Sequence, residues 1–220
     1  MMLLAIAREA LICFACVLPF LLLFELPPTL RRGKKGAGLS GRHVVFNLVF
    51  VLLLSAILDV TGIPSVRFLA GSGVLTARGL RIPAEEINLI PFHFFSADIP
   101  SELENIVLCF PLGFLLPLLW ERYRPLWKTA LCGFSFSLLI EISQLFNHRV
   151  TDVDDLLMNT LGACAGWLVW RILKNRLSCV RGKATVPEGN EGQPFLLRHE
   201  AVFDMAAAFL GMFLLYSPLL

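Results

Sequence analysis

Six long apolar stretches constrain the fold of this chain more than any other feature. A helix needs roughly 20 mostly apolar residues to cross the hydrocarbon core of a membrane. The stretches that approach this length are residues 2–26, 44–63, 105–120, 126–147, 156–173 and 201–220. Because 56% of the residues are hydrophobic and only 16% are charged, an ordinary soluble domain is excluded. The sequence predicts an all-α, polytopic bundle of about six transmembrane helices in the cell membrane.

The distribution of Lys and Arg predicts how these helices are oriented. Fourteen of the 19 basic residues lie in or beside the first, third and fifth loops. Cytoplasmic loops are enriched in such residues, so both termini are expected on the extracytoplasmic side. The predicted organisation is a first transmembrane helix with a basic cytosolic loop (1–43), a helical core (44–173), a cytosolic linker (174–200) and a C-terminal transmembrane helix (201–220). Residues 185–193, rich in Gly, Glu and Pro, are typical of a flexible linker.

Charge and cysteine content limit the expected partners. The net charge is only +2, and the basic clusters lack the interleaved aromatic residues of a nucleic-acid surface. Membrane lipids are therefore the expected partners, and no nucleic acid is. Five of the six cysteines lie within predicted helices. Cys13 and Cys16 have C-x-x-C spacing but are interpreted as packing residues rather than as a metal or redox site. No disulfide framework, metal site or cofactor is predicted.

Polar residues repeat at helical spacing in the stretches 126–147 and 156–173. Ser137, Glu141, Gln144 and His148 fall on one face of the first, and Asp155, Asn159, Gly162 and Gly166 fall on one face of the second. A polar stripe inside a membrane must face protein or water. The two stripes are therefore predicted to pack against each other, with Gly162 and Gly166 allowing the close approach and Gly133 on a different face.

The short loop between these two helices concentrates charge. Asp152 can cap the second helix while Asp155 reaches back, as in a capping box. This local role explains neither Asp154 nor Glu141, which lies about two turns inside the membrane. A carboxylate there costs about 2.5 to 3.5 kcal/mol and needs a partner, for which Arg149 and His148 are the candidates. Glu141 has either a functional role or a role in a purely structural ion pair. We favour the functional role.

A second polar segment lies ahead of the third apolar stretch. Asn88, Pro91 and Phe92 belong to an aromatic run that is typical of an interfacial or re-entrant segment. Asn105 opens the third stretch, either as a helix N-cap or as a residue that binds a ligand. Pro111 and Gly113 are expected to bend the helix that follows.

Taken in order, the motifs NLIPF, ENIVLCFPLGF, SLLIEISQ and RVTDVDDLLMNTLGACAG resemble the VanZ-like family, which is named for a protein associated with teicoplanin resistance. The basic first loop and the last apolar stretch lie outside this resemblance. It implies that residues 44–173 are a VanZ-like helical core. The implied ligand-binding or functional residues are Asn88, Pro91, Phe92, Asn105, Glu141, Gln144, Arg149, Asp152, Asp154, Asp155 and Asn159, and the implied helix-packing residues are Pro111, Gly113, Gly162 and Gly166.

Two functions are weighed. The resemblance and an outward-facing polar pocket favour a protein that binds an envelope lipid or a lipid-linked cell-wall precursor, and that lowers susceptibility to glycopeptides such as teicoplanin. The alternative is a membrane enzyme acting on a lipid-linked phosphate. In that case Glu141 or Asp154 is the general base, and Asp152 with Asp155 holds a divalent cation. Against a catalyst, the sequence has no zinc-binding helix, no phosphate loop and no nucleophile beside an obvious base.

Overall fold

A computed structural model describes residues 2–31, 40–72, 75–76, 79–80, 87–88, 99–146, 151–178, 184–188 and 195–216. Long helices account for most of this part of the chain. They are α1 (Met2–Arg31), α2 (Gly41–Thr61), α4 (Ile99–Leu119), α5 (Leu126–Gln144), α6 (Val153–Leu173) and α9 (Glu200–Leu215). The shorter helical elements are α3 (Val66–Gly71), the 3-10 helix η3 (Glu121–Tyr123) and α8 (Phe195–Arg198).

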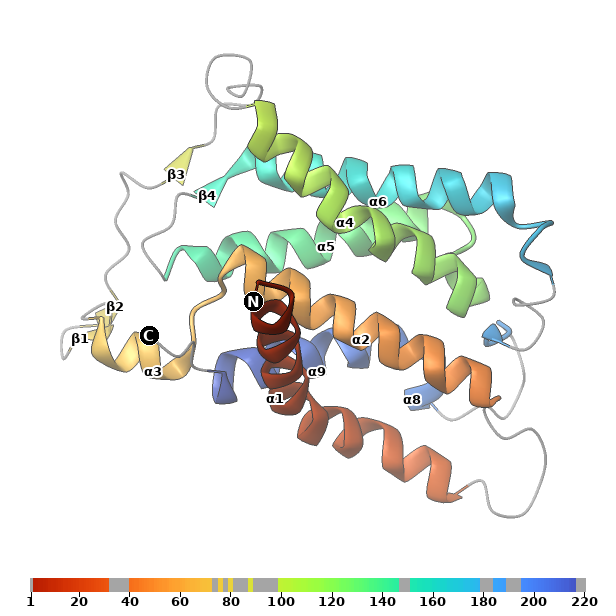
Figure 1. Ribbon diagram of the computed structural model, residues 1–220, viewed down its shortest axis with the longest axis horizontal. Coiled ribbons are helices and arrows are strands. Elements are labelled where there is room, and N and C mark those ends of the chain that lie inside the picture. Colours follow the sequence, from red (N-terminus) through yellow and green to blue (C-terminus); the bar gives the residue numbers. More distant parts are fainter. Residues whose placement is uncertain are drawn as a thin grey trace.

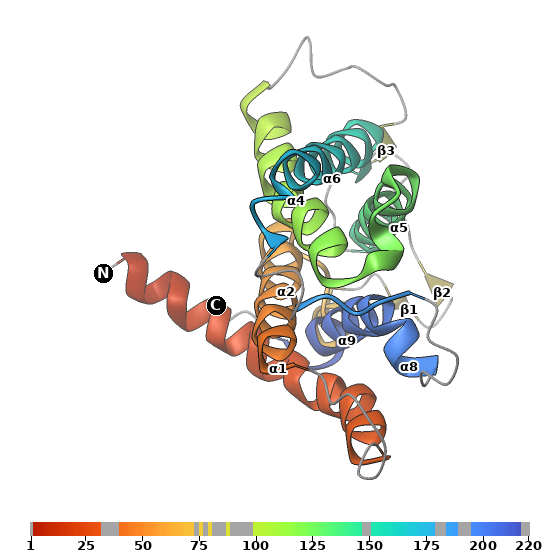
Figure 2. The same cartoon turned by 90° about the vertical axis from the view of Figure 1, so that its right-hand side faces the viewer.

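The helices form two groups that meet mainly where α2 contacts α4. One group contains α4, α5 and α6, and the other contains α1, α2 and α9 (Figures 1 and 2). The ends of α2 and α5 lie on the same side of the molecule as the starts of α4 and α6 (Figure 1). Four helix ends are thereby brought together, and they carry most of the polar residues singled out in the sequence.

Local signals explain where several helices begin and end. Ser40 caps α2 by accepting a hydrogen bond from the Arg42 backbone N–H. Gly62 stops α2 because its φ of 68° lies in the left-handed region, which glycine adopts without a steric penalty. Ser65 then caps α3 through the backbone N–H of Phe68. The polar residue before α6, Asp152, performs the same task there.

The surface of the bundle is that of a membrane protein. Four helical stretches are long and apolar enough to span a membrane: Gly41–Gly71, Glu102–Leu119, Leu126–Gln144 and Val153–Leu173. The apolar part of α1, Leu11–Phe24, is shorter, and α9 has 16 residues. Large apolar side chains such as Val45, Leu131 and Leu161 are exposed on these helices. Such a surface is favourable only against lipid. The prediction of a polytopic helical membrane protein is confirmed, and the count of six spans stays a prediction.

Two small strand pairs were not expected from the sequence. β1 (Leu75–Thr76) pairs antiparallel with β2 (Gly79–Leu80). β3 (Ile87–Asn88) pairs parallel with β4 (Thr151–Asp152), with Asn88 opposite Asp152. The second pair joins the loop ahead of α4 to the start of α6.

Two predictions from the sequence are corrected: where the third long helix begins, and the flexibility of the linker. The third long helix begins at Ile99 rather than at Asn105, so the interpretation of Asn105 as an N-cap is wrong. Residues 184–188, inside the predicted flexible linker, are docked on the end of α4. The Val186 N–H donates to the Leu119 carbonyl at 2.7 Å, and the Glu121 N–H donates to the Val186 carbonyl at 3.1 Å. An apolar residue in the linker, Val186, is buried by this contact.

Candidate functional site

Helices α4 and α6 run parallel and meet through side chains at a constant offset. The Asn105 amide donates to the Asp155 carboxylate at 2.6 Å, and one turn further the Cys109 thiol donates to Asn159 Oδ1 at 3.2 Å. One more turn along, Gly113 faces Ala163. Each step advances four residues on both helices, so the polar stripe of α6 has a matching stripe on α4.

Glycines allow these two helices to approach closely. A Cβ atom at Gly113, Gly162 or Gly166 would collide with backbone atoms of the partner helix. Gly162 and Gly166 face the backbones of Ile106 and Phe110 on α4, so the prediction that they serve the approach of α5 is wrong. Periodicity identifies a small-residue face but not the helix that packs on it.

Helix α5 packs antiparallel on another side of α6, as the two stripes predict. Asn159 donates from Nδ2 to Ser137 Oγ at 3.0 Å, and its Oδ1 accepts from α4, so this amide bridges three helices. Gly133 also belongs to this contact, because a Cβ there would lie 2.7 Å from the Ala163 Cβ. The prediction that α5 and α6 pack together is confirmed by the Ser137–Asn159 contact, but Asp155, Gly162 and Gly166 of the α6 stripe face α4. The prediction that Gly133 lies away from the interface is wrong.

Glu141 holds the start of α6 in place. Its side chain is only 4% exposed, and its Oε2 accepts a hydrogen bond from the Asp152 backbone N–H at 3.1 Å. The Thr151 hydroxyl donates to the Glu141 carbonyl at 3.3 Å. The partners expected from the sequence, Arg149 and His148, lie outside the described residues.

The aspartates of the loop take different positions. Asp152 caps α6, accepting from the Asp154 N–H at 2.9 Å, and its other carboxylate oxygen accepts from the Asn88 amide at 2.9 Å. Asp154 is fully buried. Asp155 turns toward α4 and accepts from Asn105. The predicted cap is therefore present at Asp152, but the predicted capping box is wrong, because the Asp152 N–H donates to Glu141 Oε2 while Asp155 turns to Asn105. The other two predicted residues of the preceding loop, Pro91 and Phe92, lie outside the described residues.

A groove of about 730 Å³ opens beside this polar layer, between α2, α4, α5 and α6. Four predicted residues line it: Asn105, Gln144, Asp155 and Asn159. Its outer wall is apolar and exposed, with Leu103 58% and Val107 64% accessible. Val107 lies in the stretch Glu102–Leu119, which is long and apolar enough to span a membrane. We call this cavity the amphipathic groove.

Gln144 carries an unsatisfied polar atom at the lining of this groove. Its Nε2 donates to the Thr61 carbonyl at 3.0 Å, whereas its Oε1 is buried and has no hydrogen-bond partner among the described residues. The side chain is 5% exposed. A buried acceptor without a donor costs about 1–3 kcal/mol, so a ligand that supplies a donor here would gain that free energy.

The polar groups that line the groove are mainly hydrogen-bond acceptors. Among the residues that the structure describes, its polar lining consists of amides, a hydroxyl and the carboxylates of Glu104 and Asp155, without Lys or Arg. Within the described ranges, no group of three or more His, Cys, Asp or Glu side chains is placed to hold a metal ion. Asp152 and Asp155 accept instead from separate asparagines. Asn88, Glu141, Asp152 and Asp154 are not among the groove-lining residues and support its inner wall.

Sequence reasoning missed several residues of this site, among them Cys109, Thr61 and the groove-lining Leu103, Glu104 and Val107. Cys109 was not among the predicted site residues, although it lies one helical turn after Asn105 and so shares its face. The Thr61 backbone carbonyl accepts a hydrogen bond from the Gln144 amide. A contact through a backbone atom cannot be predicted from a pattern of side chains.

Comparisons with known proteins identify the central part of the chain. A family model described as VanZ/LLP1 matches residues 49–174, which is more than half of the chain. The matched region includes most of α2 and all of α4, α5 and α6, and hence every wall of the amphipathic groove. No curated protein and no solved structure matches the chain.

Proposed function

Because the chain belongs to the VanZ/LLP1 family and the matched region contains the amphipathic groove, we propose that this membrane protein binds an envelope lipid there. The observation that carries the proposal is the combination of an apolar mouth on the lipid-facing surface with a polar inner wall. An acyl chain would lie along Leu103 and Val107, while the head group would reach Gln144 and Asp155. Binding sites of this kind fix a ligand by a few polar groups within an apolar cavity.

The polar lining favours head groups that donate hydrogen bonds. Gln144 Oε1, the Asp155 carboxylate and the Thr61 hydroxyl can all accept, and the described residues that line the groove include no Lys or Arg to pair with a bare phosphate. Sugar hydroxyl groups, amides and amines fit this pattern. A lipid-linked cell-wall precursor carries such groups, so it belongs to the ligand class that we propose.

Filling the groove mouth is the direct test. Val107→Trp places a large ring at an exposed position of the groove wall, where it does not enter the core. We expect it to reduce the amount of envelope lipid that copurifies with the protein, measured by mass spectrometry after extraction. Val45→Trp is the matched control, because Val45 is 60% exposed on α2 and does not line the groove. Equal lipid content in the two variants would contradict the proposal.

We extend the proposal to glycopeptide susceptibility, since a protein that holds a cell-wall precursor changes how much of it an antibiotic can reach. A strain lacking the protein should become more susceptible to teicoplanin, and the wild-type gene should restore resistance. Val107→Trp should accumulate normally but fail to restore it, whereas Val45→Trp should restore it. Unchanged susceptibility on deletion would remove the antibiotic part of the proposal and leave the lipid part to the copurification experiment.

The groove end of the bundle is proposed to face the extracytoplasmic side. Basic residues such as Arg42, Arg122, Arg171 and Arg198 gather at the opposite end, where α2 and α9 begin and α4 and α6 end. We expect a single cysteine at Ala70 on α3 to react with a membrane-impermeant maleimide on intact cells. A cysteine at Ser178 should react only after permeabilisation. Both would be introduced with the six native cysteines replaced by serine, and the reverse labelling pattern would invert the topology.

A further inference from the structure

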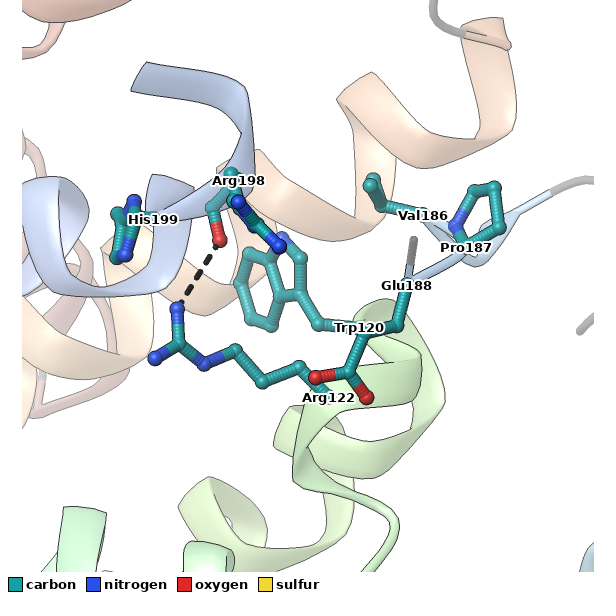
Figure 3. Close-up of a pocket in the computed structure, with 7 residues that line it drawn as sticks. All are labelled: Trp120, Arg122, Val186, Pro187, Glu188, Arg198 and His199. Carbon is teal, nitrogen blue, oxygen red and sulfur yellow. Dashed lines mark hydrogen bonds between the residues drawn. The ribbon is translucent and has the colours of Figure 1, made fainter. Parts of the chain in front are cut away.

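A basic pocket lies at the end of the bundle opposite the amphipathic groove. It has a volume of about 190 Å³ and is formed by η3, residues 186–188 and the turn between α8 and α9 (Figure 3). Arg122 enters from the η3 side and Arg198 from α8. An Arg122 Nη atom donates to the Arg198 carbonyl at 3.4 Å. His199 and the Trp120 ring also line this pocket.

Among the described residues, no carboxylate lies within ion-pair distance of the Arg122 or Arg198 guanidinium group. The nearby ion pairs are Arg124 with Glu121 at 2.7 Å and Lys128 with Glu188 at 3.1 Å. Glu188, the carboxylate among the described residues of the pocket lining, pairs with Lys128. Arg122 and Arg198 form no ion pair within the part of the chain that the structure describes. Guanidinium groups bind phosphate through paired N–H donors, so the pocket suits a phosphate group.

Arg122 also lines a second, apolar cavity. This groove of about 480 Å³ runs between α5 and α9, starting at Arg122 and Lys128 and continuing along Leu131, Leu139 and Val202. These three apolar side chains are exposed on the surface of the bundle. A basic end and an apolar continuation therefore meet at one side chain.

The basic pocket lies at the position along the bundle where the membrane interface is expected. Leu126–Gln144 is long and apolar enough to span a membrane, and Arg122 lies just before its start. Trp127, in the first turn of α5, is 64% exposed, as aromatic residues at the head-group level commonly are. The phosphates of the lipid head groups lie at this depth.

We propose that the basic pocket and the apolar groove form one site for an anionic phospholipid. The phosphate binds between Arg122 and Arg198, and an acyl chain lies along α5 and α9. The charge of the pocket and its continuity with a lipid-facing groove favour a phospholipid over a soluble anion. The lipid joins α9, which lies outside the family-matched region, to η3 and α5, which lie inside it.

Native mass spectrometry of the full-length protein in detergent, titrated with phosphatidylglycerol or phosphatidylcholine, tests the site. Arg122→Gln and Arg198→Gln should each weaken phosphatidylglycerol binding by roughly fivefold and leave phosphatidylcholine binding unchanged. Arg171→Gln is the control, because Arg171 is exposed at the same end of the bundle and does not line the pocket. Each variant is first checked for an unchanged elution volume and melting temperature without added lipid.

A variant of the apolar groove separates a lipid from a soluble anion. Leu139→Trp fills the exposed groove and should weaken phosphatidylglycerol binding even if an arginine variant fails to fold. Competition by glycerol phosphate at the same concentration as by phosphatidylglycerol would show that a soluble anion occupies the pocket. Equal affinity for both lipids, or an equal loss in Arg171→Gln, would also overturn the proposal.

Discussion

Gly162→Leu is expected to remove most of the folded protein from the membrane. Even a Cβ atom at this position would collide with the backbone of Ile106, so a leucine forces α4 and α6 apart. Their separation would also break the hydrogen bonds Asn105–Asp155 and Cys109–Asn159. Overpacking against backbone that cannot move aside should cost about 3 kcal/mol or more. The measurement is the monodisperse fraction of a fluorescent fusion in size-exclusion chromatography.

Leucine substitutions at two other glycines are the controls for this result. Gly71→Leu should accumulate like the wild-type protein, because Gly71 is exposed and a Cβ atom there has no neighbour within 4 Å. Gly133→Leu should fall between them, since its Cβ would meet the Ala163 side chain rather than backbone. Wild-type levels of Gly162→Leu would mean that α4 and α6 do not pack as described.

Asp155→Asn is expected to weaken lipid binding by about tenfold or more. Asp155 lines the amphipathic groove, and a hydrogen bond to a charged acceptor is worth about 1.5–3 kcal/mol. The substituted amide keeps the shape of the side chain and can still accept from Asn105. Lipid bound per folded protein, measured by mass spectrometry, reports the change.

Glu141→Gln is the matched control for the loss of a carboxylate charge near the groove. It also removes one carboxylate from the polar layer, but Glu141 does not line the groove, and the amide oxygen can still accept from the Asp152 N–H. We expect normal accumulation and nearly normal lipid binding. If folded Glu141→Gln lost binding while Asp155→Asn kept it, the interpretation of Glu141 as the functional carboxylate would be preferred over the groove.

Much of the helix packing could be predicted from the sequence because polar and small residues in a membrane must face protein. The spacing of Ser137 on one helix and of Asn159 on the next indicated their common interface, although Asp155 of the same stripe turns toward α4. The capping role of Asp152 followed from its place just before an apolar helix. These signals are local, so a single sequence contains them.

The remaining features depend on which segments meet across long sequence separations. The stripe of α6 does not reveal that Gly162 contacts α4 rather than α5. Asn88 reaches Asp152 through a parallel strand pair that joins residues 64 positions apart, and two-residue strands leave no periodic pattern. The groove itself depends on α2, where Val60 and Thr61 carried no polar signal in the sequence.

Site-specific photo-crosslinking measures occupancy of the amphipathic groove most directly. A benzophenone amino acid at Leu103, 58% exposed on the groove wall, is compared with one at Leu161, 53% exposed on α6 outside the groove. Lipids crosslinked in cells are identified by mass spectrometry. We expect Leu103 to capture a lipid with a hydroxyl-, amide- or amine-bearing head group, strongly enriched over the bulk membrane lipids that Leu161 captures. The same lipid profile at both positions would contradict a selective lipid site in the groove.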